Sequence, residues 1–131
     1  MLGTELLGTK KAAATVAVKS VEAAKKFYED TLGLKRDDSR GTGVLAYQSG
    51  DSTLLVYESQ FAGTNKATAV TWVVGDHDIE GVVEALRAKG VRFEHYDMPG
   101  MKREGDLHVA GRMKAAWFKD PDGNILCVIS G

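Results

Sequence analysis

Residues 115–131 read AAWFKDPDGNILCVISG, two short apolar segments separated by a polar turn. Apolar runs of this length on either side of a Pro-Asp-Gly turn predict two strands joined as a hairpin. Pro121 fixes φ at the first corner of the turn, Gly123 tolerates a positive φ, and the Asp and Asn side chains bond the nearby backbone. This turn therefore has a complete structural explanation, and we assign it no carboxylate chemistry.

The hairpin ends a longer pattern that starts at residue 68. Residues 68–74 (TAVTWVV) predict a buried strand. Asp78 can then cap a helix whose apolar residues recur at helical spacing, and Gly90 can end it. Strand candidates follow at residues 91–96, 114–119 and 125–129.

The same order of elements occurs in the first half of the chain. Residues 12–18 (AAATVAV) predict a strand, Ser20 can cap the next helix, and Gly33 can end it. A βαβββ pattern is therefore present twice, at an offset of about 56 residues. We predict an α+β fold in which two βαβββ modules form a curved mixed sheet around a cleft. The first-half strand candidates after the helix are residues 34–37, 43–48 and 53–58.

The chain length fits one domain. It has 131 residues, of which 44% are hydrophobic, enough for a packed core. We expect a single domain over residues 1–131, with a first module at about 12–58 and a second at about 68–130. Residues 1–11 are expected to be an N-terminal extension.

The composition excludes several classes of partner. The formal net charge is −1, whereas a nucleic-acid surface usually carries a strong basic excess. The single cysteine excludes an internal disulfide, and no Cys/His spacing indicates structural zinc. No signal peptide or membrane span is evident. We expect a cytoplasmic protein that binds neither nucleic acid nor membrane.

The quoted segments resemble the vicinal oxygen chelate superfamily, which includes glyoxalase I, bleomycin resistance proteins, extradiol dioxygenases and fosfomycin resistance enzymes. The matching pieces are residues 18–35, 78–91 and 116–128. The resemblance implies the fold and a homodimer, since relatives of this size are commonly dimers. It says less about function, because one scaffold hosts many chemistries.

In metal-dependent members of that superfamily, the ligands lie on the first and last strands of each module. The resemblance puts these positions on Ala13, Ala69 and Cys127, with the fourth near Val56 or Tyr57. Alanine offers no lone pair, and one thiol cannot hold an ion that needs three or four ligands. Neither first strand contains His or Glu in any register. We therefore expect no metal and no other cofactor.

Strand alternation selects candidate ligand contacts. If Ala13 and Ala69 face the cleft, every second residue after them does so too, while Trp72 turns toward its helix. Aromatic residues on later strands can line the cleft or belong to the core. The candidate ligand-binding residues are Ala13, Thr15, Tyr47, Tyr57, Ala69, Thr71, His95, Trp117 and Cys127.

Residues 97–113 form a long glycine-rich segment of the kind that often acts as a lid or binding loop. If this segment covers the cleft, His108 is the candidate general base, and otherwise it is a solvated loop histidine. The orientation of His95 on its strand is undecided. Cys127 is either a nucleophile, which needs a lowered pKa and a partner base, or an apolar filler in the cleft wall.

Two functions follow. The first is a protein that binds a small, largely apolar organic molecule in a metal-free cleft, as the resemblance to bleomycin resistance proteins implies. The alternative is a glyoxalase-type lyase or another small-molecule enzyme. Its acid–base group would be His108 or another residue outside the usual ligand set, namely His95, Glu94 or Cys127.

Overall fold

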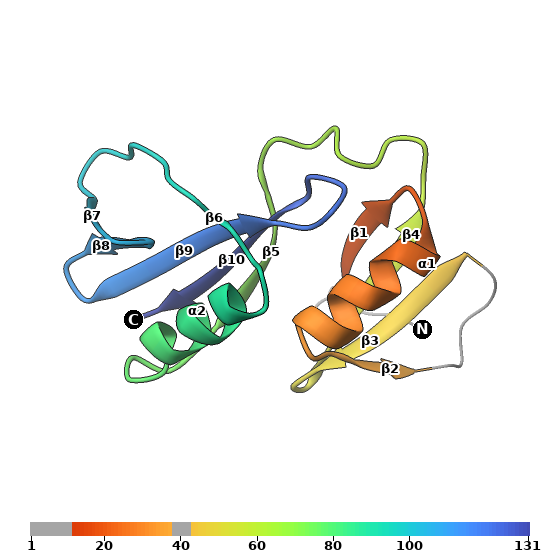
Figure 1. Ribbon diagram of the computed structural model, residues 1–131, viewed down its shortest axis with the longest axis horizontal. Coiled ribbons are helices and arrows are strands. Elements are labelled where there is room, and N and C mark those ends of the chain that lie inside the picture. The colour runs from red at the N-terminus through yellow and green to blue at the C-terminus, as the bar shows by residue number, and fades with distance from the viewer. Residues whose placement is uncertain (1–11, 38–42) are drawn as a thin grey trace, which may run out of the picture.

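The computed structural model describes residues 12–37 and 43–131. The expected N-terminal extension, residues 1–11, lies outside the described residues. The first module comprises β1 (Ala14–Val18), α1 (Val21–Lys25), a π-helical continuation η1 (Lys26–Thr31), β2 (Lys35–Asp37), β3 (Val44–Ser49) and β4 (Ser52–Glu58). The second comprises β5 (Thr68–Val73), α2 (Ile79–Ala88), β6 (Phe93–Glu94), β7 (Lys102–Glu104), β8 (Leu107–Ala110), β9 (Met113–Lys119) and β10 (Ile125–Ser130) (Figure 1).

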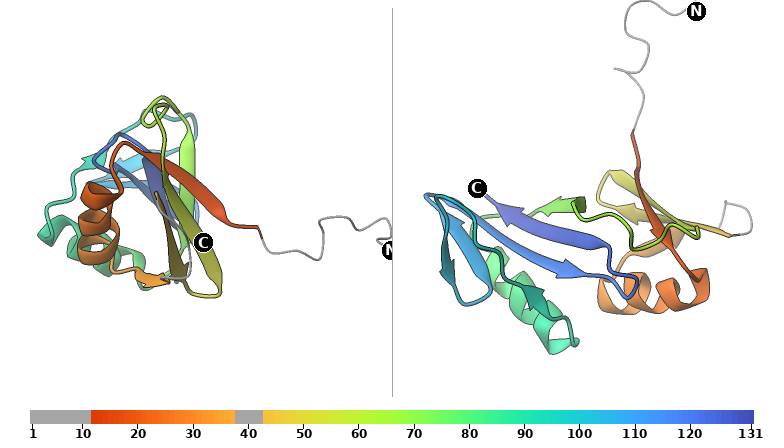
Figure 2. Two further views of the ribbon diagram at one scale, coloured as in Figure 1. Left: turned by 90° about the vertical axis from the view of Figure 1, so that its right-hand side faces the viewer. Right: turned by 90° about the horizontal axis from the view of Figure 1, so that it is seen from above.

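The strands form two mixed sheets, one from each module. The first has the order β1-β4-β3-β2, and the second has the order β5-β10-β9-β8-β7, with β6 also paired to β9. The opening strands β1 and β5 lie against each other, so the modules meet along their first strands. Both helices lie on the same side of the sheets (Figure 2). The predicted α+β fold of two βαβββ modules is confirmed.

Local sequence signals explain most helix boundaries. The Ser20 hydroxyl accepts the N–H of Ala23 at 3.4 Å, as expected of an N-cap. Gly33 and Gly90 follow the two helices with φ of +75° and +93°, the conformation in which glycine ends helices. Asp78 differs from the prediction, because its side chain makes no capping hydrogen bond. Its backbone is already helical, with φ −105° and ψ −21°, rather than extended as is usual for an N-cap residue.

Residues 97–113 are not a structureless loop. They contain a hairpin of β7 and β8, and β8 pairs with the first half of β9. The second half of the same β9 edge pairs with β6, which is only two residues long. The inserted hairpin thus uses backbone groups that would otherwise form an exposed strand edge.

The core lies between the sheets and the helices. Alternate strand residues face it, with Val16 and Val56 in the first module and Leu126 and Val128 in the second. Trp72 packs against this core, which confirms the prediction that it turns toward the helices.

The polar turn between β9 and β10 also joins the two modules. Asp120 is 4% exposed, and its carboxylate accepts the Tyr28 hydroxyl proton at 2.8 Å. The same carboxylate accepts the backbone N–H groups of Asp122 and Asn124, both at 2.9 Å. The Asn124 side-chain amide donates to Asp120 at 2.8 Å and to the carbonyl of Ala17 at 2.7 Å. The turn therefore fixes β1 and the first-module helix relative to the second sheet.

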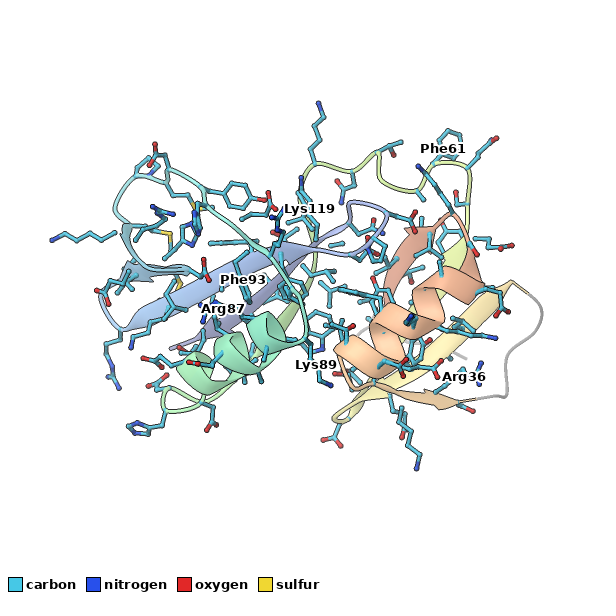
Figure 3. All side chains as sticks on the ribbon, in the orientation of Figure 1. Arg36, Phe61, Arg87, Lys89, Phe93 and Lys119 are labelled. Carbon is cyan, nitrogen blue, oxygen red and sulfur yellow. The ribbon has the colours of Figure 1, made fainter. Side chains whose placement is uncertain are left out.

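A second connection between the modules lies at the C-terminal end of α2. The Lys89 ammonium donates to the carbonyl of Asp30 at 2.8 Å. Figure 3 shows Lys89 between α2 and the first-module helix. This contact and the Asp120 turn both link residues that are far apart in sequence, so the modules have a defined arrangement.

Candidate functional site

The sheet face turned away from α1 and α2, called the open face below, carries most of the predicted ligand contacts. Trp117 pairs with Cys127, and Cys127 pairs with Thr71, so these three side chains form one row across β9, β10 and β5. His108 pairs with Ala115 in a neighbouring row. Residues directly opposite each other share a sheet face, so the second module brings these candidates together.

The first module contributes a more exposed part of the open face. Thr15 pairs with Leu55 and Ala17 pairs with Tyr57. Thr15 and Ala13 are exposed, and Tyr57 is 38% exposed. Ala69 lies at the register irregularity between β5 and β10, where Thr68 pairs with Ile125 and Val70 pairs with Leu126.

Tyr47 does not line the open face. It pairs with Leu54 on the helix side, is fully buried, and stacks on Tyr28 with ring centroids 6.0 Å apart. Its hydroxyl donates to Glu29 at 2.9 Å, and burial together with that hydrogen bond raises the pKa of the phenol. Alternation along β3 puts Tyr47 and Ala46 on opposite faces, so Tyr47 is a core residue.

His95 lies outside the row of Trp117 and Cys127, in an ion-pair cluster. Its Nε2 is 2.8 Å from one carboxylate oxygen of Asp106, and Arg87 donates to the other oxygen at 2.6 Å and 3.1 Å. The hydrogen bonds from His95 and Arg87 lower the pKa of Asp106. The cluster ties the β7–β8 turn to α2 and to the segment after β6.

Three aromatic rings gather over the second-module open face. The His108 and Trp117 rings meet edge to face with centroids 4.9 Å apart, and Tyr96 meets Trp117 in the same way at 5.6 Å. His108 is fully buried, and its Nε2 accepts the backbone N–H of Tyr96 at 2.9 Å. A neutral His108 therefore carries its proton on Nδ1, which is buried and has no partner among the described residues.

A pocket of about 350 Å³ lies beside these rings. Trp117 forms part of its wall and donates its indole N–H to the Thr68 hydroxyl at 3.1 Å. The Tyr96 hydroxyl is buried without a hydrogen-bond partner in the described part of the chain. Burial raises the pKa of this hydroxyl, so it remains a proton donor. The residues that line the pocket include Lys66, Thr68, Tyr96, Met98, Trp117 and Ile125.

Of these lining residues, only Trp117 was a predicted ligand contact, and Tyr96 and Met98 show what sequence reasoning missed. Glu94 pairs with Trp117 and therefore lies on the open face. Alternation puts Tyr96, two residues later, on the same face, so the strand pattern could have predicted it. Met98 lies beyond the strand, and no local pattern indicates its position.

Cys127 is 3% exposed and lies beside Trp117 on the open face. Burial raises the pKa of its thiol to about 11. The thiol is therefore protonated at neutral pH, whereas nucleophilic cysteines are deprotonated. In this structure its environment is that of an apolar wall residue.

The positions that hold metal in related folds do not fit a divalent ion here. The first strands offer the methyl groups of Ala13 and Ala69 and the hydroxyls of Thr15 and Thr71. The raised pKa of Cys127 disfavours the thiolate that binds metal. Across residues 12–37 and 43–131, no three His, Cys, Asp or Glu side chains lie together as a metal site would require. We derive no metal-dependent step.

The fourth metal-ligand position, near Val56 or Tyr57, does not fit a divalent ion either. Val56 is buried on the helix side, and Tyr57 follows it on the open face. Glu58 is the acidic residue next to them, and its carboxylate accepts the N–H of Val21 at 3.4 Å, at the start of α1. It therefore acts at the helix terminus.

The arrangement of modules, sheets and open face matches a known superfamily. Residues 11–128 match the model of the Glyoxalase/Bleomycin resistance protein/Dioxygenase superfamily. The chain belongs to this superfamily. The comparison with curated proteins found no match.

Solved structures with the same fold span nearly the whole chain. A lactoylglutathione lyase from Agrobacterium tumefaciens is 17% identical, with a TM-score of 0.69 and coverage of 94% of both chains. A genomically encoded fosfomycin resistance protein from Listeria monocytogenes is 12% identical, with a TM-score of 0.70 and coverage of 94% of this chain and 93% of that one.

A glyoxalase/dioxygenase from Nostoc punctiforme is 16% identical, with a TM-score of 0.71 and coverage of 99% of this chain and 95% of that one. At these identities the likeness shows the fold alone. The described helices are too short or too polar to span a membrane.

Proposed function

We propose that the protein binds a small, largely apolar organic molecule in the open-face pocket of its second module, without a metal ion. The observation that carries the proposal is the pocket wall itself. Trp117, Met98 and Ile125 supply apolar surface, and Tyr96 also lines the pocket, with its buried hydroxyl unpartnered among the described residues. Pockets of this size with few polar groups suit small organic ligands. The ligand would place an apolar body against Trp117 and a hydrogen-bond acceptor at Tyr96.

Calorimetric titration with 2-naphthol tests this proposal. We expect saturable binding that chelator leaves unchanged. Replacing Trp117 by Leu removes the flat wall and should weaken binding about tenfold, the loss of an aromatic contact worth about 1 kcal/mol and its buried area. Tyr96→Phe should weaken it about 2- to 10-fold through the lost hydrogen bond.

Phe61→Leu is the matched control, because this exposed ring lies in the linker between the modules, does not line the pocket, and should leave the 2-naphthol affinity unchanged. The proposal fails if chelator abolishes binding, or if Phe61→Leu weakens binding as much as Trp117→Leu. Tight binding of nickel or zinc at one ion per subunit, held by side chains of β1 and β5, would also remove its basis.

The alternative, a glyoxalase-type lyase with His108 as acid or base, stays a prediction. A general base needs a free lone pair, and the Nε2 lone pair of His108 accepts the N–H of Tyr96. Catalysis by His108 would therefore require the segment around Tyr96 to move. Turnover of a hemithioacetal that persists in His108→Ala would exclude this role.

We also propose a homodimer in the cytoplasm. On the open face, Val73 is 80% exposed and Tyr57 is 38% exposed, and burial of such residues favours association. Sedimentation should give twice the monomer mass, and Val73→Lys should dissociate the dimer. Phe61→Lys is the control, because Phe61 is 67% exposed but lies in the linker between the modules. A monomeric wild-type protein would contradict the proposal.

The cytoplasmic location is favoured by the free thiol of the only cysteine.

A further inference from the structure

A second hollow lies on the helix side of the sheets, where α2 faces the end of the first-module helix. Its volume is about 230 Å³. Leu32 and Leu34 line it from the first module, and Trp72, Val82 and Leu86 line it from the second. It lies across the sheet from the open face, because Trp72 and Thr71 are adjacent residues of one strand and point to opposite faces.

The polar group in this apolar wall is Ser49, at the end of β3. Its hydroxyl oxygen accepts the indole N–H of Trp72 at 2.9 Å. Within the described part of the chain, this hydroxyl acts only as an acceptor, so its own proton can be donated to a further group. The indole N–H, in contrast, is already satisfied. The hollow therefore offers one hydrogen-bond donor, the Ser49 hydroxyl.

We propose that this hollow is a second binding site, which takes a compact neutral molecule with an apolar body and one hydrogen-bond acceptor. No charged side chain of the described residues lines it, which excludes ionic ligands. An apolar cavity of about 150 Å³ holds benzene, so the larger volume here suits a single ring with a short substituent. The proposal is independent of the open-face site, because the two sites share no residue.

Acetophenone and ethylbenzene are suitable probes, because they have similar shapes and only acetophenone carries a carbonyl acceptor. The chain has two tryptophans, and each indole N–H reports one site in a ¹H–¹⁵N spectrum. Trp72 reports the helix-side hollow and Trp117 reports the open-face pocket. We expect acetophenone to shift the Trp72 indole resonance saturably, both in the wild type and in Trp117→Leu.

Two variants separate filling of the hollow from donation by Ser49. Leu86→Phe enlarges a wall residue on α2 and should abolish the Trp72 shift. Ser49→Ala should weaken acetophenone binding about 2- to 10-fold, the loss of one hydrogen bond, and leave ethylbenzene binding nearly unchanged. Ser52→Ala is the matched control, since this exposed serine of the same turn donates to the Ser49 carbonyl at 2.8 Å and does not line the hollow.

The proposal is overturned if the Trp72 resonance does not move, if its shift disappears in Trp117→Leu, or if Leu86→Phe binds acetophenone as the wild type does. Equal affinities of the two probes, or equal effects of Ser49→Ala and Ser52→Ala, overturn the assignment of the donor. Should Leu86→Phe fail to fold, the serine pair and the two probes decide the outcome. Failure of 2-naphthol to bind would leave this proposal intact and would count only against the open-face function.

Discussion

Replacing Tyr28 by Phe tests whether the Asp120 turn holds the two modules together. The substitution removes one hydroxyl from a fully buried ring and leaves the ring itself in place. The lost hydrogen bond joins the phenol to a buried carboxylate at 2.8 Å across a sequence separation of 92 residues. Hydrogen bonds to charged groups contribute about 1.5–3 kcal/mol, so we expect the free energy of unfolding to fall by about 2 kcal/mol.

The corresponding change in melting temperature follows from the size of the chain. At about 2.1 cal/mol/K per residue, 131 residues have an unfolding entropy of about 0.28 kcal/mol/K. A loss of about 2 kcal/mol then lowers Tm by about 7 °C. Urea unfolding followed by circular dichroism and a thermal scan together measure both quantities.

Tyr47→Phe is the matched control, because it removes the same hydroxyl from the ring stacked on Tyr28. Its partner Glu29 is 29% exposed at the side chain, so water can replace the lost donor. We expect a cost of about 1 kcal/mol. A Tyr47→Phe cost equal to or above that of Tyr28→Phe would refute the assignment of the Asp120 turn as the stronger link.

The hydrogen bond between Tyr28 and Asp120 also makes the free energy of unfolding depend on pH. Burial and the neighbouring Asp120 carboxylate raise the pKa of Tyr28. The unfolded chain therefore loses the Tyr28 proton first, at a pKa of about 10, and the stability due to this group is full below that pH and declines above it. The difference in unfolding free energy between wild type and Tyr28→Phe should shrink as pH rises above 10. A difference that grows over that range would contradict the linkage.

Three further substitutions or measurements test other parts of the structure. Cys127, with a pKa of about 11, should react with a disulfide reagent at pH 8 at least about tenfold more slowly than a free thiol of pKa about 8.5, and a reaction at the free-thiol rate would contradict its burial. Asp106→Asn should speed hydrogen exchange in β8 at pH 7. Since the pKa of Asp106 is lowered in the fold, this difference should disappear as pH falls below about 4, and unchanged exchange at pH 7 would show that the ion-pair cluster does not hold the hairpin. Gly63→Ala should destabilise the fold by more than Gly50→Ala in urea, because both have positive φ but only a Cβ at Gly63 meets the Asp122 carbonyl. The cost at Gly50 should be about 1–2 kcal/mol, and equal costs would contradict the contact.

Part of the candidate site follows from strand alternation alone. Thr71 and Trp72 point to opposite faces because side chains alternate along a strand, whereas Trp117, Thr71 and Cys127 share the open face because they pair across β9, β10 and β5. The same rule turns Trp72 toward the helices. For β3, alternation does not say which set of side chains faces the helices, because that depends on the pairing register with β4. The pairing of Tyr47 with Leu54 puts Tyr47 on the helix side. Alternation predicts which residues share a face, and only strand pairing decides which face that is.

The sequence by itself determined the order and type of most elements and the ends of the helices, because Ser20, Gly33 and Gly90 act on backbone groups only a few residues away. The tertiary structure alone decided the β7–β8 hairpin, the pocket beside Tyr96 and the role of Asp120 as a bond between modules. These features depend on which distant groups are buried together. A carboxylate such as Asp120 acquires its partner through packing, and no local pattern records that choice.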